Sequence, residues 1–438
     1  MKPGGATHVA IIGGGYAGMA AAVTLAAQSI PTTVFEAGKQ LGGRARRVVY
    51  RNTILDNGLH VLIGAYSETQ RLIRAVSEPG DAAPFLEIPL QWKMQGELSL
   101  RAPRLPAPLH MLFALLFARG IGWRERIDAA RFMQAQRNRG YRLEHDISVA
   151  QLLQQAGQNT RICALLWQPL CVAALNTPAD TASAQVFLNV LRDSLGSNRR
   201  EASDLLLPRV DLTALFPDRA ARYISTRDGR VLLAHSVESI QRKDAGMEVS
   251  VAGKPHRFSH VICALPPHRV SALLASLPEL AGPARLIDAF RYEPIHSIYL
   301  QYPRSLALPA PMIGLSGGMA QWIFDRERIC SQHGLIGAVI SASRVRSQTS
   351  QEQIAAAVHA QLTDALGPLP APVWQRVIAE KRASFACTVG LRRPAPATSV
   401  RNFYFAGDYT ESDYPATLEG AVRSGVACAR MLIDRERQ

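Results

Sequence analysis

The stretch that decides the fold of this chain reads His8-Val9-Ala10-Ile11-Ile12-Gly13-Gly14-Gly15-Tyr16-Ala17-Gly18. Its first half is apolar and rich in β-branched residues, which predicts a short strand buried on both faces. Gly13, Gly15 and Gly18 then follow the G-x-G-x-x-G pattern of a dinucleotide-binding turn. Gly13 permits the sharp turn, Gly15 lets the backbone approach a pyrophosphate, and Gly18 lets the next helix pack on the strand.

The elements that follow complete a nucleotide-binding unit. A helix is predicted from Ala17 to Ala27, so that its first amides, beside Tyr16, and its dipole point at the phosphates. A second apolar strand over 32–35 ends at Glu36, next to Ala37. A carboxylate at this place accepts hydrogen bonds from both ribose hydroxyls and disfavours a 2′-phosphate. The alternative is a glycine-rich turn with a surface glutamate, which leaves the strand, helix and acid unconnected.

These features do not distinguish NAD from FAD, but the next segment does. Gly42-Gly43-Arg44 resembles the motif of the glutathione-reductase-like flavoproteins of the amine oxidase and phytoene desaturase type. The resemblance implies that the paired glycines pass close to the diphosphate and flavin, and that the arginine supplies positive charge. Asp56-Asn57-Gly58 follows where those proteins have another turn, which places Gly58 at the cofactor. For Asp56 alone, an ordinary Asx turn is the competing interpretation.

The far end of the chain resembles the second half of the same site. Gly407-Asp408 ends an expected strand, and Asp408 resembles the family acid that accepts a hydrogen bond from a ribityl hydroxyl. The last helix opens soon afterwards, with Thr417 and Leu418 at its start. In such proteins this helix end faces the flavin pyrimidine and stabilises the anionic reduced flavin. Val237 matches a position whose backbone reaches the adenine, and a plain core residue is the alternative.

The cofactor-binding pieces are far apart in the sequence, so one domain must be assembled from separate stretches. We assign residues 1–75, 215–275 and 390–438 to an FAD-binding Rossmann domain of an α/β fold. Residues 76–214 and 276–389 are assigned to an inserted α+β cap domain that binds substrate. A chain of 438 residues that is 47% hydrophobic can form a core in each domain.

Four blocks of the expected cap carry a narrower resemblance. They are Trp167–Pro178, Val190–Gly196, Ser203–Leu212 and Gln321–Arg326. They look like blocks of the hydroxysqualene dehydroxylases, the squalene-associated FAD proteins of bacterial hopanoid synthesis, and the resemblance covers essentially the whole chain. It implies reductive removal of a hydroxyl from hydroxysqualene to give squalene, in an elongated apolar tunnel.

That reaction needs an acid and a dry, apolar site. Hydroxide is a poor leaving group, so an acid should protonate it, and apolar and aromatic walls should shield the carbocation. Asp204, beside three leucines that would raise its pKa, and Cys171 are the candidate catalytic residues. The alternatives are that Asp204 pairs with Arg209 or caps a helix, and that Cys171 is a buried inert thiol. Tyr414 either lines the site or belongs to the core.

Other activities use the same scaffold. Flavin amine oxidases place a lysine near the flavin on a strand resembling Ile295–Leu300, and no lysine occurs there. A phytoene-type desaturase is harder to exclude, because its substrate is also a long polyene. A prenyl-lipid carrier would lack the cofactor motif, whereas Glu36, Arg44 and Asp408 are present. With one dinucleotide motif, no separate NAD(P)H site is evident, and the external electron donor stays open.

Composition bounds the partners and the compartment. The net charge of +14 suits anionic lipid or nucleic acid, but no nucleic-acid motif occurs. Six scattered cysteines predict neither a metal site nor a disulfide framework, and they fit a reducing cytoplasm. The first strand starts too early for a signal peptide. The apolar run Leu109–Ala118, flanked by arginines, predicts either a peripheral contact with the inner face of the membrane or a tunnel wall.

Overall fold

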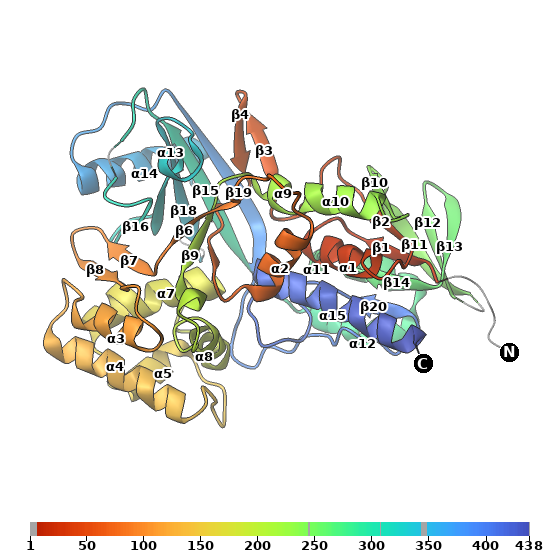
Figure 1. Cartoon of the computed structure of the whole chain (residues 1–438), viewed down its shortest axis with the longest axis horizontal. Coiled ribbons are helices and arrows are strands. Elements are labelled where there is room, and N and C mark those ends of the chain that lie inside the picture. The colour runs from red at the N-terminus through yellow and green to blue at the C-terminus, as the bar shows by residue number, and fades with distance from the viewer. Residues whose placement is uncertain (1–6, 244–245, 307, 343–347, 438) are drawn as a thin grey trace.

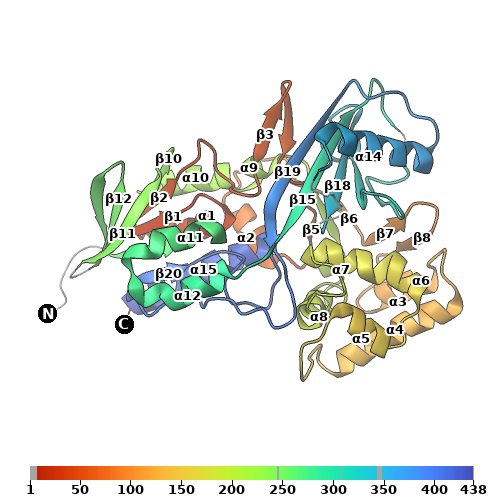
Figure 2. The same cartoon turned by 180° about the vertical axis from the view of Figure 1, so that it is seen from behind.

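The chain has two parts joined by long strands, as seen in the computed structural model (Figure 1). The structure describes residues 7–243, 246–306, 308–342 and 348–437. One part holds the glycine-rich turn and both chain ends. The other consists of a sheet with one covering helix and, beside it, a group of helices (Figure 2).

A parallel sheet of five strands forms the nucleotide-binding part. Its order is β10 (Arg230–Leu233), β2 (Thr32–Glu36), β1 (Val9–Ile12), β14 (His260–Cys263) and β20 (Phe403–Phe405). The central strands are fully buried, as their apolar composition predicts. The strand order brings together three sequence regions that lie hundreds of residues apart, so the Rossmann-type fold is assembled from separate stretches.

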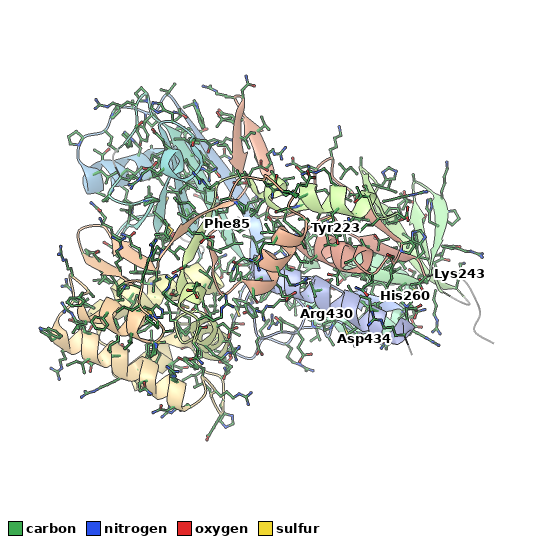
Figure 3. The ribbon with its side chains drawn as sticks, viewed as in Figure 1. Phe85, Tyr223, Lys243, His260, Arg430 and Asp434 are labelled. Atoms are coloured by element: carbon green, nitrogen blue, oxygen red, sulfur yellow. The ribbon has the colours of Figure 1, made fainter. Side chains whose placement is uncertain are left out.

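Helices cover both faces of this sheet. They are α1 (Tyr16–Ala26), α10 (Pro217–Ser225), α11 (Pro267–Leu273), α12 (Ala281–Asp288) and α15 (Leu418–Glu436). α1 and α15 pack closely because Gly425 has no side chain: a Cβ there would lie 2.1 Å from the carbonyl oxygen of Ala17. An antiparallel sheet of β11 (Val237–Lys243), β12 (Gly246–Val251) and β13 (Lys254–Phe258) closes one end. Lys243 marks that end, opposite the cap helices (Figure 3).

The cap contains a mixed sheet of seven strands. Their order is β19 (Trp374–Phe385), β15 (Tyr292–Gln301), β18 (Leu335–Ser341), β17 (Trp322–Asp325), β16 (Met312–Gly314), β7 (Gln91–Met94) and β8 (Leu98–Arg101). Helix α14 (Gln351–Leu366) packs against it, and a capping box of Ser350 and Gln353 starts this helix. α13 (Arg326–Cys330) follows β17. The sequence analysis did not identify β19, the longest strand of the sheet.

Helices form the rest of the cap. They are α3 (Leu109–Leu116), α4 (Trp123–Asn138), α5 (Val149–Gln155), α6 (Thr160–Ile162), α7 (Gln168–Leu175) and α8 (Ala184–Asp193). α3 and α4 lie side by side in both views (Figures 1 and 2). Among the described residues, no helix is both long and apolar enough to cross a bilayer.

Small elements connect the two parts. A sheet of β5 (Leu62–Ile63), β9 (Leu205–Pro208) and β6 (Phe85–Ile88) mixes strands from both assigned domains. Phe85, near the middle of the molecule, belongs to the core of the nucleotide-binding part (Figure 3). The hairpin β3 (Arg47–Tyr50) and β4 (Thr53–Asp56), with α2 (Ser67–Ala75) and α9 (Leu212–Leu215), completes the connection. The assigned domain boundaries stay a prediction, and residues 1–6 and 438 lie outside the described part.

Candidate functional site

One cavity of about 1150 Å³ runs from the glycine-rich turn into the cap. Every residue predicted to bind the cofactor lines this cavity, with the exception of Gly18. Its size exceeds the range of roughly 300–1,000 Å³ that is usual for small-molecule sites. The cavity therefore has room for a dinucleotide and a second ligand.

The three glycines of the turn have distinct tasks. Gly13 has φ +113°, which side chains rarely adopt, and a Cβ on it would lie 2.6 Å from the carbonyl oxygen of Ala264. A Cβ on Gly18 would lie 2.0 Å from the Gly13 carbonyl oxygen, so Gly18 serves helix packing rather than the cavity. Gly15 starts α1 with an ordinary backbone conformation, and its nearest neighbour would be 3.9 Å away. Only Gly15 keeps space open for a ligand.

Glu36 lies at the end of β2, where the predicted ribose-binding acid belongs. Its Oε2 accepts a hydrogen bond from the amide of Gly14 at 2.8 Å, and its Oε1 accepts one from Gly38 at 2.7 Å. Both contacts fix the carboxylate between the turn and the next loop. Val237 lines the same end of the cavity, so the predicted ribose and adenine contacts remain compatible with the geometry.

The Gly42-Gly43 loop lies directly against the turn. The amide of Gly42 donates to the carbonyl of Gly14 at 3.0 Å, and a Cβ on Gly43 would lie 3.3 Å from the Cα of Gly15. Gly42 has φ +109°, a conformation that glycine adopts without strain. The two glycine motifs therefore form one backbone surface around the expected diphosphate.

An ion pair joins the two distant halves of the site. Nη2 of Arg44 lies 2.6 Å from Oδ1 of Asp408, and Nη1 of the same arginine donates to the carbonyl of Ala383. The Asp408 side chain is only 6% exposed. Asn57 fixes the loop, because its side-chain nitrogen Nδ2 donates to the Arg44 carbonyl at 2.6 Å. The ion pair leaves the second carboxylate oxygen of Asp408 for the predicted ribityl contact.

The Asx-turn interpretation of Asp56 is wrong. Its Oδ1 accepts a hydrogen bond from the amide of Leu212, 156 positions away, at 2.8 Å. Burial raises the pKa of this carboxyl to about 7, although Arg326 opposes the shift. Asp56 therefore ties β4 to α9, while Gly58 lines the cavity as predicted.

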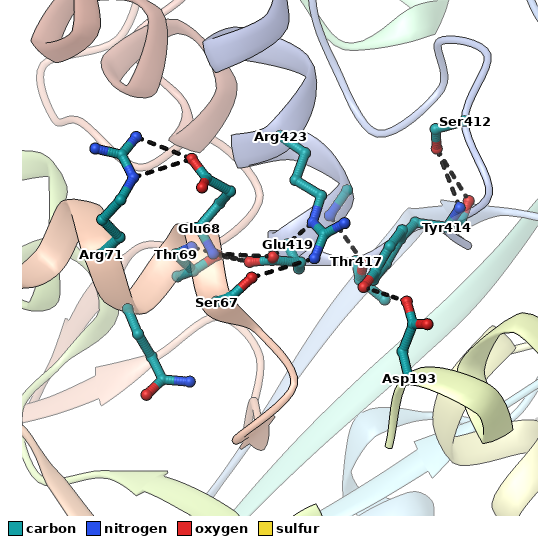
Figure 4. A network of polar contacts seen from close by, with 12 residues as sticks. Ser67, Glu68, Thr69, Arg71, Asp193, Ser412, Tyr414, Thr417, Glu419 and Arg423 are labelled. Atoms are coloured by element: carbon teal, nitrogen blue, oxygen red, sulfur yellow. Dashed lines mark hydrogen bonds and ion pairs between the residues drawn. The ribbon is translucent and has the colours of Figure 1, made fainter. Parts of the chain in front are cut away.

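The start of α15 is held by a polar network (Figure 4). Thr417 caps the helix by accepting from the amide of Gly420 at 3.1 Å. Glu419, fully buried, accepts from the amide and the hydroxyl of Thr69, at the start of α2, and from Arg423. The helix N-terminus is thus fixed with its free amides toward the cavity, where Thr417 and Leu418 line it.

A tyrosine–aspartate pair lies on the cavity wall beside this helix start. The Tyr414 hydroxyl donates to Oδ2 of Asp193 at 2.7 Å, and Arg192 donates to Oδ1 at 2.7 Å. Burial raises the pKa of Tyr414, and the hydrogen bond to Asp193 raises it further. Asp193 belongs to the block Val190–Gly196, but nothing in the sequence pairs it with Tyr414, which lies 221 positions away.

The two candidate catalytic residues do not reach the cavity. Asp204 pairs with Arg200 at 3.2 Å, not with Arg209, and its neighbours Ser203 and Leu205 line the cavity in its place. The Cys171 side chain lies in the core, where burial raises its pKa to about 12. A thiol or carboxylate that does not touch the substrate cannot protonate it, so the geometry does not support either assignment.

The cap end of the cavity is apolar and aromatic. Trp92 and Trp322 meet edge to face with ring centroids 4.8 Å apart. The Trp92 indole nitrogen donates to the Leu165 carbonyl at 2.9 Å, so the ring orientation is fixed. Further apolar lining comes from Leu100, Leu166, Trp167 and Phe324. Because the wall carries few polar groups, this end suits a long hydrocarbon.

The residues present fit FAD. The turn is open at Gly15, a paired arginine lies beside it, and the N-terminus of α15 faces the cavity. Each feature complements an anionic part of the cofactor. Among the described residues, no cluster of histidine, cysteine, aspartate or glutamate could hold a metal ion.

Comparison with known proteins agrees with this geometry. Hydroxysqualene dehydroxylases of Sinorhizobium fredii and Rhodopseudomonas palustris are each 27% identical, over 97% of this chain and 98% of their own length. The 15-cis-phytoene desaturase of Synechococcus elongatus is 23% identical, over 98% of this chain and 96% of its own length. The similarity to the hydroxysqualene dehydroxylases that the cap blocks indicated is therefore confirmed along the whole chain.

Solved structures share the fold. An oxidoreductase from Methanosarcina mazei superposes with a TM-score of 0.73 at 13% identity, covering 97% of this chain and all of the other. Cyclohexylamine oxidase from Brevibacterium oxydans gives 0.70 at 17% identity, covering 99% of this chain and all of the other. The family described as flavin containing amine oxidoreductase matches residues 16–433. The chain therefore belongs to this flavin-containing family, and it is an FAD-dependent oxidoreductase.

Proposed function

We propose that this enzyme removes the hydroxyl group of hydroxysqualene and releases squalene. The observation that carries the proposal is the continuity of one cavity, from the nucleotide turn to a wall of tryptophan, leucine and methionine side chains. A C30 hydrocarbon chain needs such a wall along its length. The full-length similarity to hydroxysqualene dehydroxylases supports the same substrate.

The reaction is balanced by a two-electron reductant. Reduced FAD, when bound, supplies the hydride. The C–O bond of the substrate breaks, the same carbon receives the hydride, and the hydroxyl leaves as water with the proton that the two-electron reductant releases as it is oxidised. The apolar and aromatic residues that line the cavity keep bulk water away from the carbon that receives the hydride.

The Tyr414–Asp193 pair orients the hydroxyl group of the substrate in this proposal. It places a phenol and a carboxylate together on the cavity wall, beside the start of α15. A hydroxyl group that enters an apolar cavity needs such a partner, since an unpaired polar group costs about 1–3 kcal/mol. The remaining hydrocarbon then extends into the cap.

The direct test is a single turnover. Protein whose FAD has been reduced anaerobically is mixed with hydroxysqualene, and squalene is measured by mass spectrometry. We expect squalene in an amount equal to the FAD oxidised. If no squalene forms, and the oxidised enzyme instead desaturates phytoene or squalene, the enzyme is a desaturase. Boiled protein with free reduced FAD is the control.

Replacing Tyr414 by phenylalanine removes the hydroxyl and leaves the ring in place. We expect the KM for hydroxysqualene to rise or kcat to fall by roughly tenfold, because the pair no longer holds the substrate hydroxyl. Asp193→Asn should act in the same direction. The matched control is Tyr223→Phe, on α10 away from the cavity (Figure 3). Unchanged kinetics of Tyr414→Phe, at full FAD content, would remove the pair from the site.

A further inference from the structure

Helices α3 and α4 carry an unusual share of the exposed apolar surface. Among the described residues, eleven large hydrophobic side chains are exposed, and six of them lie between residues 109 and 127. Phe117 is 68% exposed and Trp123 is 62% exposed. We call this surface the α3–α4 apolar face. It consists of Leu109, Leu112, Leu116, Phe117, Trp123 and Ile127.

The exposed leucines of α3 are regularly spaced along the helix. Leu109, Leu112 and Leu116 follow at intervals of three and four, so they line one side of α3. Ala114 and Leu115 lie buried on its other side. A surface helix of a soluble protein has one apolar side, toward the core. This helix has two, and no element of the described part of the chain covers the second one.

Local contacts hold the face in shape. Arg126 donates to the carbonyl of Leu116 at 2.6 Å, and its guanidinium stacks on the Trp123 ring at 4.7 Å from the centroid. Phe117 stacks on Phe113 with centroids 6.0 Å apart. The apolar side chains thus project from a fixed pair of helices rather than from a loose loop.

Positive charge borders the same surface. Four exposed arginines lie along this part of the chain. Arg101 and Arg104 precede α3, Arg119 lies between α3 and α4, and Arg124 lies at the start of α4. Two acids, Glu125 and Asp128, lie on α4, and Glu125 is engaged in capping the helix through the amide of Gly122. Arginines that surround exposed leucine, phenylalanine and tryptophan form the pattern of an interfacial membrane contact.

The same helices form a wall of the cavity. Met111 and Leu115 of α3 and Met133 of α4 line it from the inside. The apolar face and the substrate cavity are therefore opposite sides of a wall one helix thick. An apolar ligand that leaves a bilayer at this face is separated from the cavity only by this wall.

We propose that the α3–α4 apolar face docks on a bilayer that contains anionic phospholipid, with the apolar side chains at the acyl boundary and the arginines at the phosphates. A second copy of this chain is a poorer partner, since a two-fold contact would bring the arginine borders together. Docking itself does not depend on the proposed reaction. The further step, that substrate enters here from the bilayer, rests on the proposed function.

The test is co-sedimentation of the holoenzyme with vesicles. Vesicles of phosphatidylcholine with phosphatidylglycerol should bind the protein, and vesicles of phosphatidylcholine alone should bind it at least about tenfold more weakly. The double variant Leu112→Glu/Phe117→Glu should lose binding by a similar factor. Its matched control is Val49→Glu/Val373→Glu, at two positions that are 65% and 62% exposed elsewhere. Arg119→Ser/Arg124→Ser should weaken binding to anionic vesicles only.

Two further measurements keep the interpretation unambiguous. FAD content and thermal unfolding verify that each variant is folded, and turnover of hydroxysqualene dissolved in detergent should be unchanged in Leu112→Glu/Phe117→Glu. If turnover is absent in the wild type as well, the proposed reaction fails while docking can still hold. Equal vesicle binding by the double variant and its control would overturn the docking proposal. So would a dimer in light scattering that the double variant dissociates.

Discussion

Replacing Gly15 by alanine is expected to give a folded protein that binds FAD at least roughly tenfold more weakly, a loss of about 1.4 kcal/mol or more. The added methyl group meets no protein atom closer than 3.9 Å, and the backbone there is conformationally ordinary. The methyl group would occupy the space in which the diphosphate is expected to approach the backbone. The fold should therefore tolerate the change, whereas the cofactor should not. Flavin absorbance per protein and a titration of the apoprotein with FAD measure the effect.

Two other glycines serve as controls for this experiment. Gly282, on α12, has no atom within 4 Å of an added Cβ and lies outside the cavity, so Gly282→Ala should keep full FAD binding. Gly18→Ala should instead fail to fold well, because its Cβ would meet the Gly13 carbonyl oxygen at 2.0 Å. If Gly15→Ala keeps wild-type affinity for FAD, the cofactor does not lie against this turn.

Asp408→Ala should lose both FAD and part of the stability of the protein. Removal of this carboxylate leaves the Arg44 guanidinium without its partner at 2.6 Å, in a cavity wall where water cannot fully replace it. An unsatisfied group of this kind costs about 1–3 kcal/mol. The predicted acceptor for the ribityl hydroxyl disappears at the same time. We expect a colourless protein that still unfolds cooperatively, at a lower temperature than the wild type.

Two further variants serve as comparisons for Asp408→Ala. Asp408→Asn keeps an acceptor oxygen but removes the charge, so it should retain more FAD than the alanine variant. Asp434 lies on α15, where it is exposed and distant from the cavity (Figure 3). Asp434→Ala should therefore change neither the FAD content nor the unfolding temperature. FAD retained at the wild-type ratio in Asp408→Ala would contradict the ribityl placement.

Local patterns in the sequence were sufficient to predict the helices and strands that form the nucleotide-binding part. β1, α1, β2, β20 and α15 lie within a few residues of their predicted bounds. Each is specified by its own residues: a β-branched run, a turn that requires glycine, or a helix start that requires a cap. The twelve-residue strand β19 was not predicted, because its buried and charged residues alternate only weakly. Its partner strand β15 is also far away in the sequence.

The structure does not support the two catalytic candidates, for a related reason. Asp204 and Cys171 were chosen from their sequence neighbours, yet the neighbours in space decide whether a side chain is available for chemistry. Asp204 forms an ion pair with Arg200, and Cys171 is buried in the core. Tyr414 and Asp193 could not be paired beforehand, since nothing in either segment indicates the other.

By itself, the sequence determined that this protein binds a dinucleotide through a strand, a glycine turn and a helix, because backbone conformation and close approach are properties of consecutive residues. Only the tertiary structure decided that Arg44 meets Asp408 across 364 positions, that one cavity unites turn and cap, and that α3 turns a second apolar side outward. Contacts between distant segments depend on how all the elements pack at once, which no single stretch of residues specifies.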